Sequence, residues 1–165
     1  MRIEDQRPRR HYAEVLRALG AQLDDISAGD VTLVELEHGF LVQAATNPAD
    51  PSAHGNGVER VERIVTDPEI ERAIEEGHAR RASGREAGTI ERALRVVGSQ
   101  VDLHGSSGVL VLQQGDGWVL RHLVPDGVTR SVIQDFLGPR LEEIRMIAAG
   151  RRRYTTPPRR RLFGR

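Results

Sequence analysis

The sequence predicts an α+β domain in which one helix-hairpin unit occurs twice. Residues 16–42 and 94–120 align without a gap at an offset of 78, with seven identities in 27 positions: Leu16/Leu94, Arg17/Arg95, Gly20/Gly98, Gln22/Gln100, Asp24/Asp102, Val31/Val109 and Gly39/Gly117. The helical stripe of Tyr12, Val15, Leu16, Leu19 and Leu23 recurs at Ile90, Ala93, Leu94, Val97 and Val101. Each stripe leads into two apolar segments that turn at His38-Gly39 or Asp116-Gly117. Two copies of period 78 are too few and too long for a solenoid, so we expect a pseudo-twofold domain.

The first unit begins with a polar arm that is typical of a frayed terminus and includes Arg2, Arg7, Arg9, Arg10 and His11, and a helix then runs from about Arg9 to Asp25. After a turn at residues 27–30, residues 31–36 and 40–45 form a hairpin. His38 stands in its turn, where histidine is expected because it tolerates a positive φ. Both faces of these strands are apolar. In an antiparallel sheet with one solvent-exposed face, apolar and polar residues should alternate along each strand. These strands do not alternate, so we expect both faces to be covered, by helices or by a second copy of the chain.

Between the units, the sequence predicts a loop and two helices. Residues 47–57 are rich in proline and glycine and indicate a loop. The spacing of Val58, Val61, Ile64 and Val65 predicts a short helix. A second helix starts at Asp67-Pro68-Glu69, with Asp67 as its cap, and residues 79–88 form a mobile connection to a cap at Thr89.

The second unit repeats the hairpin at residues 109–112 and 118–123. A long amphipathic helix then runs from Val128 to Ile147, kinks at Gly138-Pro139, closes the core and ends at Gly150. Each unit gives two strands to one antiparallel sheet. The expected domain is residues 1–150, with units at roughly 9–66 and 89–150 and a helical insertion at 67–88. Residues 151–165 are expected to be a disordered Arg-rich tail.

Composition excludes several kinds of chemistry. The 165 residues include no cysteine, which excludes disulfides, thiolate metal sites and cysteine nucleophiles. All 24 basic side chains are arginine, which excludes Schiff-base lysines. No apolar run approaches the roughly 20 residues of a membrane span, and the N-terminus lacks a signal-type apolar region, so we expect a cytoplasmic protein with no transmembrane segment.

The motifs that carry polar chemistry are each better explained as structure. Residues 104–108, His-Gly-Ser-Ser-Gly, lack the spacing of a hydrolase elbow and lead into a strand, which indicates a helix-to-strand loop. The six histidines lack metal-site spacing, and His122 is expected to be partly buried and hydrogen-bonded. Residues 54–57 could cradle an anion, but a flexible loop is the favoured interpretation. The acidic residues of 69–76 look like an exposed helix face. We therefore predict no catalytic residue, metal or cofactor.

The C-terminal tail is the one stretch whose composition favours a binding site. From residue 144 onward there are eight arginines and no acid, which leaves 16 basic against 24 acidic side chains in residues 1–143. Arginines next to aromatic residues suit a phosphate-rich partner such as nucleic acid or an anionic surface. The candidate residues are Arg151, Arg152, Arg153, Tyr154, Arg159, Arg160, Arg161 and Arg165.

Three functions remain open. The favoured one is a non-catalytic interaction or adaptor domain that forms a homodimer and binds another protein, because two packing units account for nearly every patterned residue. The alternatives are a nucleic-acid-associated regulator anchored by the tail and an enzyme of unrecognised type. The order helix, hairpin, helix, strands, helix is similar to that of roadblock-type dimerisation modules, which the chain resembles in this order alone.

Overall fold

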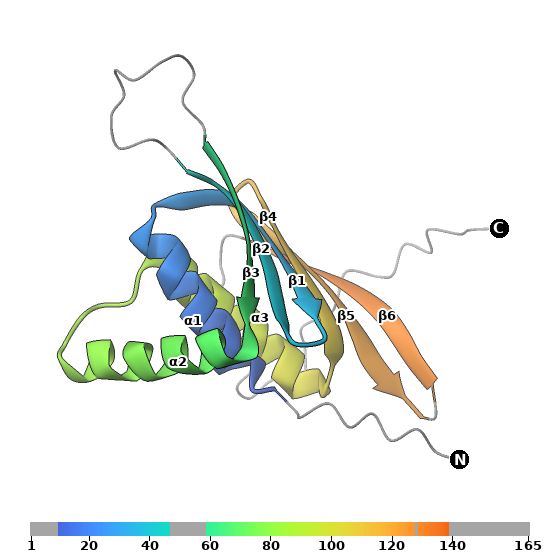
Figure 1. The fold of residues 1–165 in the computed structure, drawn as a ribbon. Helices are drawn as coiled ribbons and strands as arrows, with labels where there is room; N and C mark the ends of the chain where they lie inside the picture. Colours follow the sequence, from blue (N-terminus) through green and yellow to red (C-terminus); the bar gives the residue numbers. More distant parts are fainter. Residues whose placement is uncertain (1–9, 47–58, 128, 139–165) are drawn as a thin grey trace.

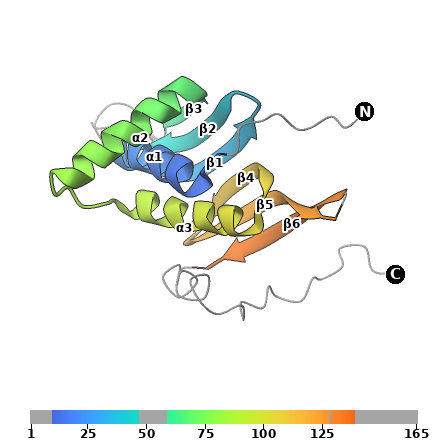
Figure 2. The same cartoon turned by 90° about the horizontal axis from the view of Figure 1, so that it is seen from below.

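The computed structural model describes residues 10–46, 59–127 and 129–138. Within these ranges the fold is α+β, with three helices and one six-stranded antiparallel sheet of strand order β3-β2-β1-β4-β5-β6 (Figure 1). The elements are α1 (Tyr12–Asp25), β1 (Ala28–Leu36), β2 (Gly39–Thr46), β3 (Glu59–Thr66), α2 (Asp67–Ala82), α3 (Thr89–His104), β4 (Ser107–Gln114), β5 (Gly117–Asp126) and β6 (Thr129–Leu137). All three helices lie on the same side of the sheet (Figure 2).

The core lies between the helices and the sheet. The predicted helical stripes are confirmed as the buried sides of α1 and α3, where Leu16 and Leu94 are fully buried. Val31, Leu33 and Phe40 face them from the first hairpin, and Val109, Val111 and Leu120 face them from the second. Burying such side chains stabilises the fold by about 1.5–3 kcal/mol each.

Both predicted hairpins are confirmed, with strands somewhat longer than expected. β1 pairs with β2 and β4 pairs with β5, while the central β1–β4 pair joins the two hairpins into one sheet. One detail of the turn was wrong. Positive φ among the described non-glycine residues occurs at Ser27 and Asp30, so His38 is not chosen for that conformation.

The helix predicted from Val58 to Val65 is wrong, because residues 59–66 form the edge strand β3. This strand pairs along its whole length with β2, and Val61 and Val65 lie opposite Ala44 and Phe40. Four apolar residues at mixed spacing fit a helical or a strand period equally well. All four are β-branched, which favours the strand once a hairpin offers a free edge.

The helix predicted from Val128 onward is also wrong over residues 129–137, which form the opposite edge strand β6. Val132 and Phe136 point away from the helices while Ile133 and Leu137 point toward them, so both faces carry apolar residues. The inward position between them holds Asp135, which hides the alternation of a strand. Each half therefore contributes three strands instead of two. The rest of the predicted helix, its end at Gly150 and the tail from 151 to 165 lie outside the described residues.

The helix starts are capped differently from the prediction. The cap of α2 is Thr66, which forms a reciprocal capping box with Glu69, while Asp67 is the first helical residue. At α3 the cap position is Gly88, and the helix N–H groups are satisfied by Asp24 from the end of α1. A cap supplied by another helix fixes tertiary packing as well as the helix start.

Candidate functional site

The side of the sheet that faces away from the helices carries two apolar rows, which together we call the open face. The first row crosses four neighbouring strands through Ile64, Leu41, Val34 and Leu110, each directly opposite the next. The second row starts from the other edge, crosses three strands through Phe136, Val119 and Leu112, and reaches the polar Thr32 on β1. The two rows are neighbours on β1 and β4 and merge there into one band.

Each row ends in a hydrogen-bonded polar pair. The first row continues into Arg121 and Gln134, whose side chains lie 2.8 Å apart, Nη2 to Oε1. The second continues into Gln43 and Glu62, 3.0 Å apart, Nε2 to Oε2. An apolar centre with polar ends is the usual anatomy of a protein–protein interface.

The open face is solvent-accessible in the described structure. Ile64 is 58% exposed and Leu112 is 37% exposed, Val34, Leu41 and Leu110 are half-buried, and Val119 is only 8% exposed. The sequence predicted that both faces would be covered, by helices or by a second copy of the chain, and the helices that the structure describes all lie on the other face (Figures 1 and 2). Single exposed apolar residues are ordinary, whereas a continuous band across six strands is typical of a binding surface.

A buried carboxylate at the junction of the two hairpins was missed by the sequence analysis. Glu35 accepts hydrogen bonds from Arg10, Tyr12 and the backbone N–H of Gly108, at 2.7, 3.1 and 2.7 Å. Burial and then the bond to Glu35 raise the pKa of Tyr12. Arg10 also binds Asp67, so it is an ordered part of the domain and not of a frayed arm. The sequence did contain a signal for this site, because Glu35 follows Val31 and Leu33 at alternate positions and so lies on the same, core-facing side of β1.

A second buried polar chain joins three residues whose types match a hydrolase triad. His122 Nδ1 lies 2.6 Å from Ser106 Oγ, and its Nε2 lies 3.0 Å from Asp135 Oδ2. His122 is fully buried, and Ser106 and Asp135 are 6% and 4% exposed. A nucleophile must reach its substrate, and these three side chains are enclosed. Their hydrogen bonds are therefore suited to holding β5, β6 and the α3–β4 loop together. The sequence predicted a hydrogen-bonded His122, and the structure buries it completely.

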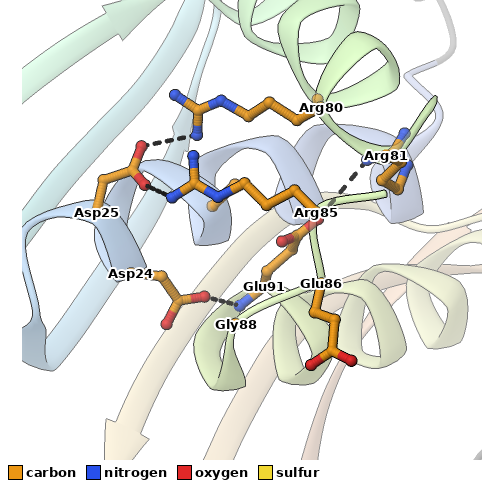
Figure 3. Close-up of a pocket in the computed structure, with 10 residues that line it drawn as sticks. Asp24, Asp25, Arg80, Arg81, Arg85, Glu86, Gly88 and Glu91 are labelled. Atoms are coloured by element: carbon orange, nitrogen blue, oxygen red, sulfur yellow. Dashed lines mark hydrogen bonds and ion pairs between the residues drawn. The ribbon is translucent and has the colours of Figure 1, made fainter. Parts of the chain in front are cut away.

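A third polar cluster surrounds a pocket of about 260 Å³ between α1, the end of α2 and the start of α3 (Figure 3). Arg80 and Arg85 both bind Asp25, at 2.8 and 3.0 Å, and Arg81 lies 3.6 Å from Glu91. The hydrogen bond to Asp25 raises the pKa of Arg80. The guanidinium groups are already paired with carboxylates, so the cluster ties α2 to the other helices and is not an unoccupied anion site.

The other sequence-predicted residues fall into two groups. Residues 104–108 make the expected helix-to-strand connection, from the end of α3 through a loop at 105–106 into β4, with Gly105 in the left-handed conformation as the cap of α3. The arginines and Tyr154 of the predicted anionic-partner site lie outside the described residues, as do residues 54–57. Within the described ranges, no three His, Asp or Glu side chains gather as a metal site requires.

No family model, curated protein or solved structure matches this chain. None of the described helices is long and apolar enough to cross a membrane.

Proposed function

We propose that the chain is a non-catalytic protein-interaction domain that binds through the open face. The observation that carries this proposal is the apolar band on the side of the sheet opposite the core. Apolar side chains on that side add nothing to the helix-packed core, and they cost solubility unless a partner covers them.

The partner that we propose for the open face is a second copy of the chain. Six strands at a spacing of about 4.8 Å, each about 26 Å long, present roughly 700 Å². Two stacked copies then bury roughly 1,400 Å², within the range of about 1,200–2,000 Å² for stable interfaces. Face-to-face packing of two sheets about 10 Å apart is a common arrangement in proteins.

The test compares two leucine-to-arginine variants by analytical ultracentrifugation over a range of concentrations. Leu112→Arg places a charge in the open face, while Leu103→Arg, the control, alters a 61% exposed leucine on α3. Two copies each lose a buried leucine, worth about 1.5–3 kcal/mol, so Leu112→Arg should weaken the dimer at least about 100-fold. A wild-type chain that stays monomeric, or equal weakening by both variants, would show that the open face does not bind a second copy.

The alternative is an anionic partner bound by Arg151, Arg152, Arg153, Tyr154, Arg159, Arg160, Arg161 and Arg165. It is supported by the charge asymmetry of the sequence. Anisotropy titrations of the full chain and of residues 1–150 with nucleic acid test it. Binding that needs the tail and weakens steeply with salt would support it, and equal behaviour of both chains would exclude it.

A further inference from the structure

Pairs of residues 78 positions apart make reciprocal contacts between the two halves of the domain. Asp24, at the end of α1, accepts hydrogen bonds from the N–H groups of Ile90 and Glu91 at 3.1 and 2.8 Å. Asp102, at the end of α3, accepts them from Tyr12 and Ala13, both at 2.9 Å. Adding 78 to the residues of one contact gives those of the other, with the halves interchanged. α1 and α3 are therefore antiparallel, and each caps the other.

The same reciprocity extends to the helix crossing. A Cβ on Gly20 would lie 2.8 Å from the Cα of Glu91, and one on Gly98 would clash with the carbonyl oxygen of Tyr12. Both glycines thus allow the backbone of the opposite helix to approach closely.

In the sheet, Val109 N–H donates to Glu35 at 3.4 Å while Val31 N–H donates to Gln113 at 3.2 Å. The central strands pair Leu33 with Val111, two residues that are themselves 78 apart. The local axis relating the halves therefore passes through this pair.

A surface on which residue i meets j while j meets i is isologous, as at the interface of a twofold dimer. Here the two surfaces belong to one chain and are joined through residues 83–88, which follow α2 and precede α3. None of these capping, glycine and strand contacts depends on that covalent connection. They would be equally satisfied by the matching half of another molecule.

We propose that two copies of this chain exchange halves, so that residues 10–82 of one copy dock on residues 89–138 of the other. The exchanged dimer contains two globular bodies, each with the capping, glycine and strand contacts of the monomer. Only the connection changes, because it must pass from one body to the other, and six extended residues span about 20 Å. The exchange leaves the open face uncovered and does not depend on the function proposed above.

The Arg17–Glu91 ion pair allows a direct test, because it joins the two halves. Arg17 Nε lies 3.0 Å from Glu91 Oε1, and the side chains are 14% and 10% exposed. Arg17→Glu places two acids at this contact within one chain, and Glu91→Arg places two arginines there. When the two full-length variants exchange halves with each other, one body recovers Arg17–Glu91 and the other gains the reversed pair. The first body is relieved of like-charge repulsion, and in the second the repulsion is reduced but not removed, because Arg81, 3.6 Å from Glu91, also faces the substituted side chain.

The two variants, carrying different affinity tags, are unfolded in urea, mixed in equal amounts, refolded together at high concentration and weighed by native mass spectrometry. Random pairing gives mixed dimers equal in amount to the two like dimers combined. Half exchange predicts at least about a tenfold excess of the mixed dimer. No excess, or no dimer, overturns the proposal.

Two further measurements keep the result decisive if the charge variants fold poorly. Wild-type chains with the two tags, refolded together, should form a mixed dimer whose share rises with concentration, and monomers alone at every concentration overturn the proposal. Adding Leu112→Arg to both tagged wild-type chains should leave the mixed dimer unchanged. Loss of the dimer on that addition would assign the pairing to the open face and overturn half exchange.

Discussion

The reciprocal caps lead to a quantitative prediction for Asp24→Ala and Asp102→Ala. Each aspartate accepts two backbone hydrogen bonds at the positive end of the opposite helix. A hydrogen bond to a charged group contributes about 1.5 kcal/mol or more, so each substitution loses about 3 kcal/mol. Alanine recovers about 0.7 kcal/mol of helix propensity, and removing an acid from the C-terminal end of its own helix recovers about 0.3 kcal/mol. The expected net destabilisation is about 2 kcal/mol for each variant.

Urea denaturation monitored by the single, buried Trp118 measures these changes. The two values should be similar, because the contacts are related by the offset of 78, and the double variant should lose about 4 kcal/mol because the caps lie at opposite ends of the helix pair. Asp116→Ala, in the exposed β4–β5 turn, is the control. A loss below about 0.5 kcal/mol at both capping positions, or a large loss at only one of them, would show that the two aspartates are not equivalent stabilising caps.

Three more predictions concern packing, buried polarity and pH. Gly98→Ala should destabilise the fold by about 1–3 kcal/mol because its Cβ meets backbone of α1, whereas Gly29→Ala, which meets nothing within 4 Å, should cost less than about 1 kcal/mol; equal losses would contradict the close helix approach. Asp135→Ala should cost about 2–4 kcal/mol by leaving the buried Nε2 of His122 without its partner, and should speed amide exchange in β6 more than in β1; unchanged exchange would contradict the role of the Ser106–His122–Asp135 hydrogen bonds. The hydrogen bond from His78 lowers the pKa of Glu14 from 4.5 in the folded state. The stability that this bond adds is therefore fully present above about pH 4.5 and is lost as the pH falls through the lowered folded-state pKa. Glu14→Gln should flatten this part of the profile of stability against pH, and an unchanged profile would contradict the role of the bond.

The sequence predicted the parts of the fold in which the spacing of apolar residues follows one period, that of a helix or that of a strand. The stripes of α1 and α3 repeat at helical spacing, and the two hairpins have turn residues between short apolar segments. The prediction of the edge strands β3 and β6 failed because their apolar residues do not alternate with polar ones. In β6 the cause is physical, since Asp135 occupies a core-facing position that only its bond to His122 makes acceptable.

The candidate site was only partly visible from the sequence. The apolar character of both strand faces was predicted, but the side on which the helices pack depends on tertiary structure. The identities at Gly20/Gly98 and Asp24/Asp102 lay outside the apolar stripe, and their roles became clear only when the opposite helix was in place. Glu35 and Gln113 differ in type, so their equivalent contacts to Val109 and Val31 left no identity to find.

The most direct test of the proposed binding face is a methyl-NMR dilution series of the wild-type chain. Methyl signals of Leu41, Ile64, Leu110 and Leu112 should shift together as the concentration rises, while those of the buried Leu94 and of Leu103 on α3 should stay in place. Signals of the open face that do not change with concentration, or shifts confined to the helix side, would contradict it.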